Sequence, residues 1–183
     1  MQDASELTMK YFKYLDLNFQ PASNKLREYL IKENKIDDIK SSWRYLDTDN
    51  ILKEIPELTE IFLPFNIDIA TVGIFVSYMK EGSIHIDNVN FPCRINFPVL
   101  NCEDTVTNFF KTTTPPIVRK QVNGLLFHQY NSESCELADQ MYLTQATVMR
   151  VQEPHQVVMN HDRYPRVSCT ISFHQDISYL LDT

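Results

Sequence analysis

The sequence predicts a mainly β fold, an antiparallel barrel or double-sheet jelly roll with supporting helices at its N-terminal end. From about residue 67 onward the chain consists of short β-type runs broken by Gly, Pro, Asn and Asp, the residues that turns require. Eight such runs follow one another with no long helical stretch between them. This pattern favours packed antiparallel sheets over an α/β fold.

Residues 1–65 are expected to form a helical support region. Within residues 23–34 three apolar residues recur at helical spacing behind Ser23, the expected N-cap: Leu26, Leu30 and Ile31. Residues 47–62 predict a second helical stretch that Pro56 interrupts. We expect both helices to pack on one outer face of a sheet, which leaves the interior of the barrel for a ligand.

Residues 66–176 are expected to form the β core. The eight expected strands are 71–79, 83–88, 93–100, 104–112, 124–130, 146–152, 155–160 and 166–174. A chain of 183 residues fits one domain, which buries roughly two-thirds of the surface that its unfolded form exposes. No internal repeat or linker divides the sequence, so we expect one domain over residues 1–183.

Composition argues against several classes of function. The net charge of −7 and the pI near 5.2 disfavour nucleic-acid binding, which relies on clustered Lys and Arg. The three glycines, Gly73, Gly82 and Gly124, supply no phosphate-binding loop. No apolar run approaches the roughly 20 residues that span a bilayer, so no membrane partner is expected.

The cysteines and the N-terminal segment predict a cytoplasmic protein. No pair among the four cysteines has CxxC spacing, and charges throughout the first residues are unlike a signal peptide. We therefore expect reduced, buried thiols. The four cysteines are Cys93, Cys102, Cys135 and Cys169.

A candidate metal site begins at His85 and Asp87. In a strand, residues i and i+2 point to the same face with their Cα atoms about 6 to 7 Å apart, so this pair could offer a nitrogen and an oxygen to one metal ion. A third ligand is needed, since two histidines and one carboxylate form the facial triad of non-haem Fe(II) oxygenases. The other histidines are His128, His155, His161 and His174.

His155 is the preferred third ligand because it begins a late strand that is followed by a second strand starting at Arg166. We expect these strands to form a hairpin whose His155 and Arg166 face one cavity. Arg166 and Ser168 would then form a clamp for a carboxylate, which the planar guanidinium binds through two parallel hydrogen bonds. His174 and Asp176 form a second HxD pair, but no histidine follows them.

Each of these residues has a simpler interpretation when taken alone. His85 and Asp87 could be solvated residues on an exposed strand face, and Arg94 and Arg166 could be surface arginines. The combination and its order favour a metal site: HxD first, a single histidine about seventy residues later, then Arg and Ser two residues apart.

The pattern His85-x-Asp87, His155 and Arg166-x-Ser168 resembles that of the Fe(II)- and 2-oxoglutarate-dependent oxygenases. The residues after the HxD pair and the segment beginning at residue 154 are similar to the aspartyl/asparaginyl β-hydroxylase-like branch and to small related proteins of bacteriophages. In that branch an arginine nine residues after the first histidine helps to hold co-substrate or substrate, a spacing that Arg94 matches.

Two departures from the branch concern the carboxylate and the second arginine. The aspartyl hydroxylases proper lack the carboxylate ligand, which Asp87 supplies here. The family arginine commonly lies ten residues after the second histidine, whereas Arg166 lies eleven after His155. Arg163 is a rival, but Arg166 is preferred because it enters its strand in phase with Ser168.

The resemblance implies a double-stranded β-helix, a jelly-roll or cupin-like barrel, and a dioxygenase that hydroxylates an unidentified substrate, possibly a protein or peptide side chain. It implies Fe(II) on His85, Asp87 and His155, and 2-oxoglutarate and O₂ as co-substrates, with Arg166, Ser168 and Arg94 holding anionic groups. The chain could be virus-encoded. Two alternatives stay open: a non-catalytic jelly-roll interaction or phage structural protein, and a cupin-like metal enzyme without 2-oxoglutarate.

Overall fold

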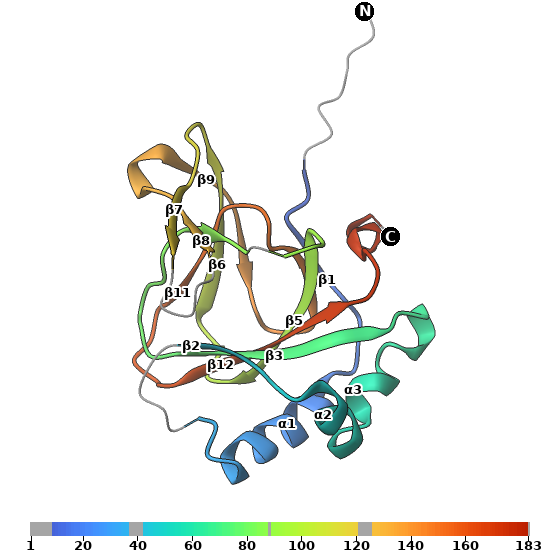
Figure 1. Ribbon diagram of the computed structural model, residues 1–183. Helices are drawn as coiled ribbons and strands as arrows, with labels where there is room; N and C mark the ends of the chain where they lie inside the picture. The colour runs from blue at the N-terminus through green and yellow to red at the C-terminus, as the bar shows by residue number, and fades with distance from the viewer. Residues whose placement is uncertain (1–8, 37–41, 88, 121–125, 183) are drawn as a thin grey trace, which may run out of the picture.

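The computed structural model describes residues 9–36, 42–87, 89–120 and 126–182 (Figure 1). Within them the chain forms two antiparallel six-stranded sheets, with helices on the outer face of one sheet. The expectation of a mainly β fold is confirmed. Residues 88, 124 and 125 of two expected strands, and with them Gly124, lie outside the described residues.

Sheet A contains the strands that the helices cover. Its order is β1 (Phe12–Tyr14), β10 (Thr147–Arg150), β5 (Cys93–Leu100), β12 (Arg166–Phe173), β3 (Ile69–Ser77) and β2 (Ser42–Tyr45). Every neighbouring pair is antiparallel.

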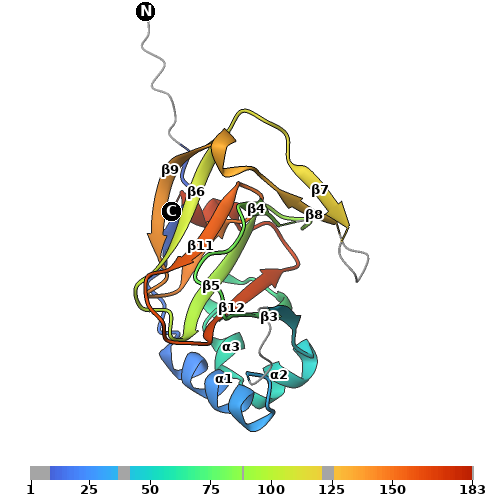
Figure 2. The ribbon, with the colours of Figure 1, turned by 90° about the vertical axis from the view of Figure 1, so that its left-hand side faces the viewer.

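Sheet B faces the inner side of sheet A, and Figure 2 views the molecule from the side where its strands β6, β9 and β11 are in front. Its order is β7 (Ile117–Lys120), β8 (Leu126–Gln129), β4 (His85–Ile86), β11 (His155–Met159), β6 (Thr105–Thr112) and β9 (Cys135–Tyr142). These pairs are also antiparallel.

All eight expected strands are present, and four further strands, β1, β2, β7 and β9, were not predicted. β9 is an edge strand on which Met141 is the one buried residue. Its sequence therefore shows no apolar alternation from which a strand could be predicted. β1 and β2 are too short to carry a pattern. Residues 1–65 therefore contain two short strands in addition to the expected helices.

The helices are α1 (Gln20–Lys32), α2 (Thr48–Glu54) and α3 (Glu57–Glu60), and short 3-10 helices follow at Leu63–Phe65, Ser132–Ser134 and Ser178–Leu181. Asp47 caps α2 by accepting a hydrogen bond from the Asn50 amide at 3.1 Å, and Pro56 separates α2 from α3 as expected.

The prediction that Ser23 caps the first helix is wrong. α1 begins three residues earlier, and Pro21 fits its first turn because no intrahelical N–H bond is required there. Ser23 instead lies buried on the helix face toward sheet A, where its hydroxyl donates to the Pro98 carbonyl at 2.7 Å. The hydroxyl therefore ties α1 to β5.

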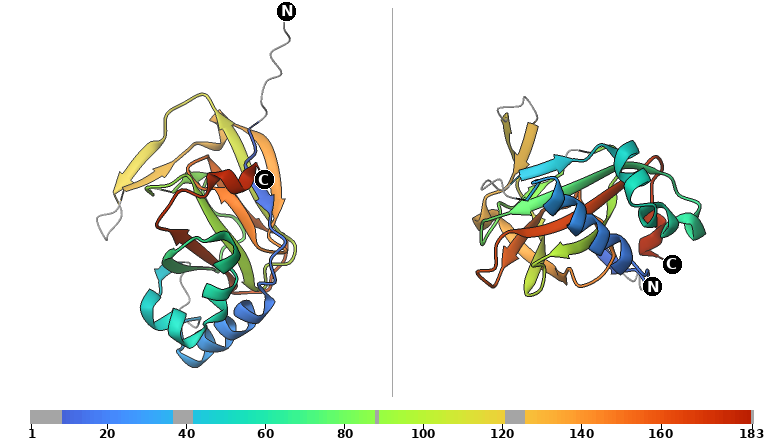
Figure 3. Two further views of the ribbon diagram at one scale, coloured as in Figure 1. Left: turned by 90° about the vertical axis from the view of Figure 1, so that its right-hand side faces the viewer. Right: turned by 90° about the horizontal axis from the view of Figure 1, so that it is seen from below.

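Period-2 alternation divides the side chains of sheet A between two environments. The apolar side chains of β12 and β3 pack in the core beneath the helices. On β12 these are Val167, Cys169, Ile171 and Phe173, and on β3 they are Val72, Ile74 and Val76. The helices bury this face, as Figures 1 and 3 show. The expected packing of the helices on one outer face is confirmed.

A smaller apolar cluster lies away from the helices and contributes Met141 and Met149 to the space between the sheets. All four cysteines are free thiols, three of them buried, while Cys135 is half-buried. Among the described residues, no helix combines the length and the apolar character needed to cross a membrane.

We predict that Leu26→Ala lowers the free energy of unfolding by about 2 to 5 kcal/mol, because Leu26 is fully buried between α1 and sheet A. Ile31→Ala on the same helix is the control, since Ile31 is 55% exposed and should change stability by less than about 0.5 kcal/mol. Urea unfolding should be followed by circular dichroism and by Trp43 fluorescence. Separate transitions for the two signals would contradict a shared core.

Candidate metal centre

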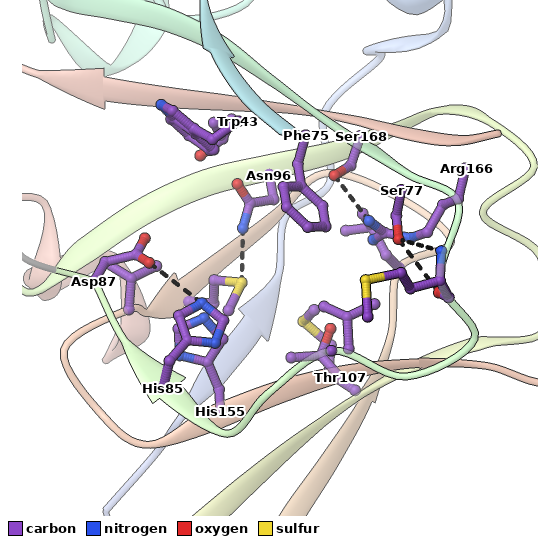
Figure 4. A pocket seen from close by; sticks show the side chains of 18 residues that line it. Trp43, Phe75, Ser77, His85, Asp87, Asn96, Thr107, His155, Arg166 and Ser168 are labelled. Atoms are coloured by element: carbon purple, nitrogen blue, oxygen red, sulfur yellow. Dashed lines mark hydrogen bonds and ion pairs between the residues drawn. The ribbon is translucent and has the colours of Figure 1, made fainter. Parts of the chain in front are cut away.

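Two histidines of sheet B and an aspartate directly after β4 form a group that could hold a metal ion. Their ligand atoms, on His85, Asp87 and His155, all lie within 4.8 Å of one another. β4 pairs with β11 so that His85 lies directly opposite His155, with ring centroids 4.5 Å apart. Asp87 follows on the same face, its Oδ1 3.6 Å from Nε2 of His85 (Figure 4). The structure thus brings together the three ligands that the sequence predicts.

Backbone carbonyls fix both imidazoles for metal binding. Nδ1 of His85 lies 2.9 Å from the Ser83 carbonyl, and Nδ1 of His155 lies 2.9 Å from the Glu153 carbonyl. Because a carbonyl can only accept, each Nδ1 carries the proton and each Nε2 keeps a free lone pair. A hydrogen bond from the other ring nitrogen to a carbonyl orients metal-ligating histidines in this way.

His155 is held in its neutral form. Burial lowers its pKa to about 4, and the neighbouring His85 acts in the same direction, while Asp87 and the Glu153 carbonyl oppose the shift. A neutral imidazole binds a metal ion without first releasing a proton. The donor set of two nitrogens and one carboxylate oxygen suits a divalent transition metal.

The opposite wall of the pocket comes from sheet A and contains a buried cation. Arg166 is 2% exposed, and its Nη1 donates to the Ser168 hydroxyl at 3.2 Å. Both point into the pocket that the three ligands line, as Figure 4 shows, and Ser77 lies opposite Arg166 on β3. The pocket has a volume of about 130 Å³.

The charge of Arg166 has no counter-ion in the part of the chain that the structure describes. Its Nε makes no hydrogen bond, and Asp87 is the one carboxylate among the described residues that line the pocket. Burial lowers the pKa of the guanidinium from its ordinary value. A buried, unpaired cation is costly, so an anionic ligand would restore the missing partner.

Several residues that line the pocket carry no recognisable signal in the sequence, among them Trp43, Phe75, Thr107 and Met149. Trp43 is the single tryptophan, and it reaches the pocket from the short edge strand β2, which has no readable pattern. Phe75, Thr107 and Met149 lie on predicted strands. That they line one pocket depends on which strands pair, and the sequence does not show this.

The predicted hairpin of β11 and β12 is wrong, because β11 belongs to sheet B and β12 to sheet A. Their residues His155 and Arg166 nevertheless line one pocket, since the two sheets face each other. β4 and β5 also lie in different sheets. Arg94 on β5, which the resemblance assigns to holding an anionic group, lines a neighbouring hollow rather than this pocket.

The remaining candidates lie outside the metal group. His128 faces Ile86 and Val118 in the strand register of sheet B. Nδ1 of His161 accepts a hydrogen bond from the Arg163 amide at 3.1 Å, and His174 is exposed beyond β12. The Arg163 side chain is 54% exposed and faces acidic residues, so Arg166 is the arginine of the pocket.

No protein-family model matches the chain, and no curated protein matches it. Among solved structures, AviO1 from Streptomyces viridochromogenes Tue57 aligns with 93% of this chain and 92% of its own at 12% sequence identity, with a TM-score of 0.46. A similarity at this level carries no functional conclusion. Function is therefore inferred from the residues of the site.

We predict that His155 makes the metal-free protein less stable as the pH falls from about 6.5 to about 4. The unfolded histidine binds its proton near pH 6.5 and the native one near pH 4, so the unfolded state binds more protons throughout this window. The loss amounts to about 3 kcal/mol at most, at about 1.4 kcal/mol for each pKa unit.

Urea titrations at several pH values should measure this loss. His155→Gln should show a flatter dependence of stability on pH than the wild type, whereas His174→Gln, at an exposed position, should follow the wild type. Equal slopes for wild type and His155→Gln would contradict the assignment.

We also predict that one divalent ion, tested with Fe(II), Co(II) and Mn(II), binds per chain and raises the Tm, because binding to the folded state alone stabilises it. His85→Ala and His155→Ala should each lose most of the bound metal. His128→Ala removes a histidine from the adjacent strand β8 and should retain it. Equilibrium dialysis with metal analysis measures the content, and unchanged metal in His85→Ala would contradict the site.

Proposed function

We propose that the protein is an Fe(II)- and 2-oxoglutarate-dependent dioxygenase that hydroxylates its substrate. One observation carries the proposal: a single pocket contains two histidines and a carboxylate on one wall and, on the other, a buried arginine with no carboxylate partner among the described residues. The first set suits Fe(II) with open coordination positions. The second suits a dicarboxylate that reaches from the metal to the opposite sheet.

His85, Asp87 and His155 would hold the iron, and Arg166 with Ser168 would bind the distal carboxylate of 2-oxoglutarate. When bound, iron and 2-oxoglutarate together supply the oxidation chemistry: O₂ is consumed, 2-oxoglutarate becomes succinate and CO₂, and one oxygen atom is inserted into a substrate C–H bond. The protein orients these partners. Its Nδ1–H bonds to the Ser83 and Glu153 carbonyls would leave each Nε2 free to bind the metal.

Apolar side chains complete the pocket and limit the access of water. They come from both sheets and the segments that join them, and include Met141, Leu143, Met149, Val151 and Val157. Low polarity strengthens the attraction between Arg166 and a bound carboxylate. It also keeps a reactive oxidant from the solvent.

The order of the strands supports a double-stranded β-helix, in which successive strands alternate between the two sheets. β3, β5, β10 and β12 belong to sheet A, while β4, β6, β9 and β11 belong to sheet B. The chain crosses between the sheets at every step from β3 to β6 and from β9 to β12. Such crossings let residues far apart in sequence face one cavity.

A cytoplasmic location is part of the proposal, supported by the four free cysteines, because oxidising compartments favour disulfides. The resemblance to the aspartyl/asparaginyl β-hydroxylase-like branch makes a protein or peptide side chain the first substrate class to test. The net charge of −7 disfavours a nucleic acid.

We predict that the purified protein forms succinate from 2-oxoglutarate in the presence of Fe(II) and O₂. Chromatographic assay of succinate should give no product with His85→Ala. Arg166→Gln should raise the KM for 2-oxoglutarate at least tenfold, because a buried charge-assisted pair is lost, and Arg166→Lys should recover part of it.

Arg163→Gln serves as the matched control, since Arg163 is exposed and outside the pocket, and it should behave as the wild type. Succinate formation that does not require iron, or that His85→Ala retains, would contradict the proposal. Tight metal binding with no succinate in any condition would favour a non-catalytic jelly-roll protein.

A further inference from the structure

A β-bulge lies directly before the first metal ligand, His85. Glu81 pairs with Val158 in an isolated antiparallel bridge, and His85 pairs with His155. From Glu81 to His85 the chain advances by four residues, whereas from Val158 back to His155 it advances by three. The segment that leads to His85 therefore contains one extra residue relative to β11.

The hydrogen bonds locate the bulge at Ser83 and Ile84. The Gly82 amide still donates to the Val157 carbonyl at 3.0 Å, in register with the bridge that precedes it. The extra residue must then follow Gly82, so Ser83 and Ile84 together lie opposite a single residue of β11, Gln156. Two residues that face one on the partner strand define a β-bulge.

The extra residue determines which side chains face the pocket. In a regular strand, Gly82 would share its face with Ile84, and His85 would point to the opposite face. Instead Gly82, His85 and Asp87 all line the pocket. The bulge thus turns both ligands of this segment toward the metal position, the effect that bulges commonly have beside functional sites.

Side chains satisfy two neighbouring carbonyls at the bulge. The Gly82 carbonyl accepts a hydrogen bond from Nε2 of Gln156 at 2.8 Å. The next carbonyl, of Ser83, accepts from Nδ1 of His85 at 2.9 Å and so holds the ring of the ligand. The Gln156 amide and the His85 imidazole are therefore bonded to adjacent peptide groups, and a rotation of one peptide group would disturb both bonds.

The Gln156 side chain is itself fixed. It is 9% exposed, and its Nε2 also donates to Oε1 of Glu81 at 2.9 Å. Because an amide nitrogen carries two protons, both are used in these bonds. Beyond the bulge, the Ile84 carbonyl accepts from the Tyr130 amide at 2.9 Å. The bulge is thus anchored by Gln156 on one side and by the residue that follows β8 on the other.

We propose that Gln156 is a positioning residue of the metal centre, which holds the bulge closed and thereby keeps the Ser83 carbonyl on Nδ1 of His85. His85 then stays in the tautomer whose Nε2 is free for the metal. Without the amide, the Gly82 carbonyl loses its partner and the peptide groups of the bulge can rotate. The inference rests on the metal centre of the proposed function but does not require turnover.

Gln156→Met tests this role, because methionine has a similar length and no amide. Nitrogen-edited NMR of the metal-free protein at slightly alkaline pH reports the tautomer of each histidine. We expect His85 to change from the Nδ1–H form to a mixture of both tautomers, while His155, which bonds to a carbonyl of its own strand segment, stays unchanged. The Kd for Co(II) should rise at least about tenfold, as is common when an outer hydrogen-bonding partner of a metal ligand is lost.

Three further variants separate positioning from general destabilisation. Gln156→Asn retains an amide that is one methylene too short to reach the bulge and should show the same two changes. Glu81→Gln retains an oxygen that accepts from Gln156 and should behave as the wild type. Leu26→Ala removes packing beneath the helices, far from the bulge, and should keep the wild-type tautomer and Co(II) affinity although it unfolds more easily.

An unchanged His85 tautomer and Co(II) affinity in Gln156→Met would refute this inference alone, and so would equal losses in Leu26→Ala. No Co(II) binding by the wild type would overturn both the inference and the proposed function. Co(II) binding that depends on Gln156, in a protein that forms no succinate, would support the inference and refute the dioxygenase function alone.

Discussion

The central strand β12 of sheet A has apolar side chains toward the helices and polar side chains toward sheet B, and the site depends on this division. On β12 the inner residues are Arg166, Ser168, Thr170 and Ser172, while the residues between them pack beneath the helices. The helices bury the apolar face and so allow the inner face to be polar. A sandwich interior lined in this way holds a ligand more readily than a dry core.

Sheet B provides the complementary part of the site. The cross-strand pair of His85 and His155 is fixed by the pairing of β4 with β11, and the two backbone carbonyls orient the rings. Neither sheet could form the pocket alone, because the two histidines lie on sheet B and the buried arginine on sheet A. The site therefore requires that the two sheets pack against each other.

The sequence predicts the residues of the site better than it predicts how the strands meet. Alternation with period 2 is local, so it correctly places His85 with Asp87 and Arg166 with Ser168. Strand pairing is not local, which is why the expected hairpin of β11 and β12 is wrong although His155 and Arg166 still face one pocket.

Arg94 and Trp43 illustrate the same limit. The motif spacing singles out Arg94, but its contact with Trp43 depends on the edge strand β2, which is too short to recognise. Gly73 contributes as well, since a Cβ there would approach Cζ2 of Trp43 to 2.7 Å. The absence of a side chain at this position of β3 thus makes room for the indole.

In the proposed function, one pocket binds a metal ion and a dicarboxylate together. Calorimetric titration of 2-oxoglutarate into protein with and without Mn(II), a stand-in for iron, tests it most directly. We expect one molecule to bind per chain with Mn(II), much weaker binding without it, and loss of the metal-dependent binding in both His155→Ala and Arg166→Gln. Binding of equal strength with and without the metal, or binding that Arg166→Gln retains, would contradict the claim.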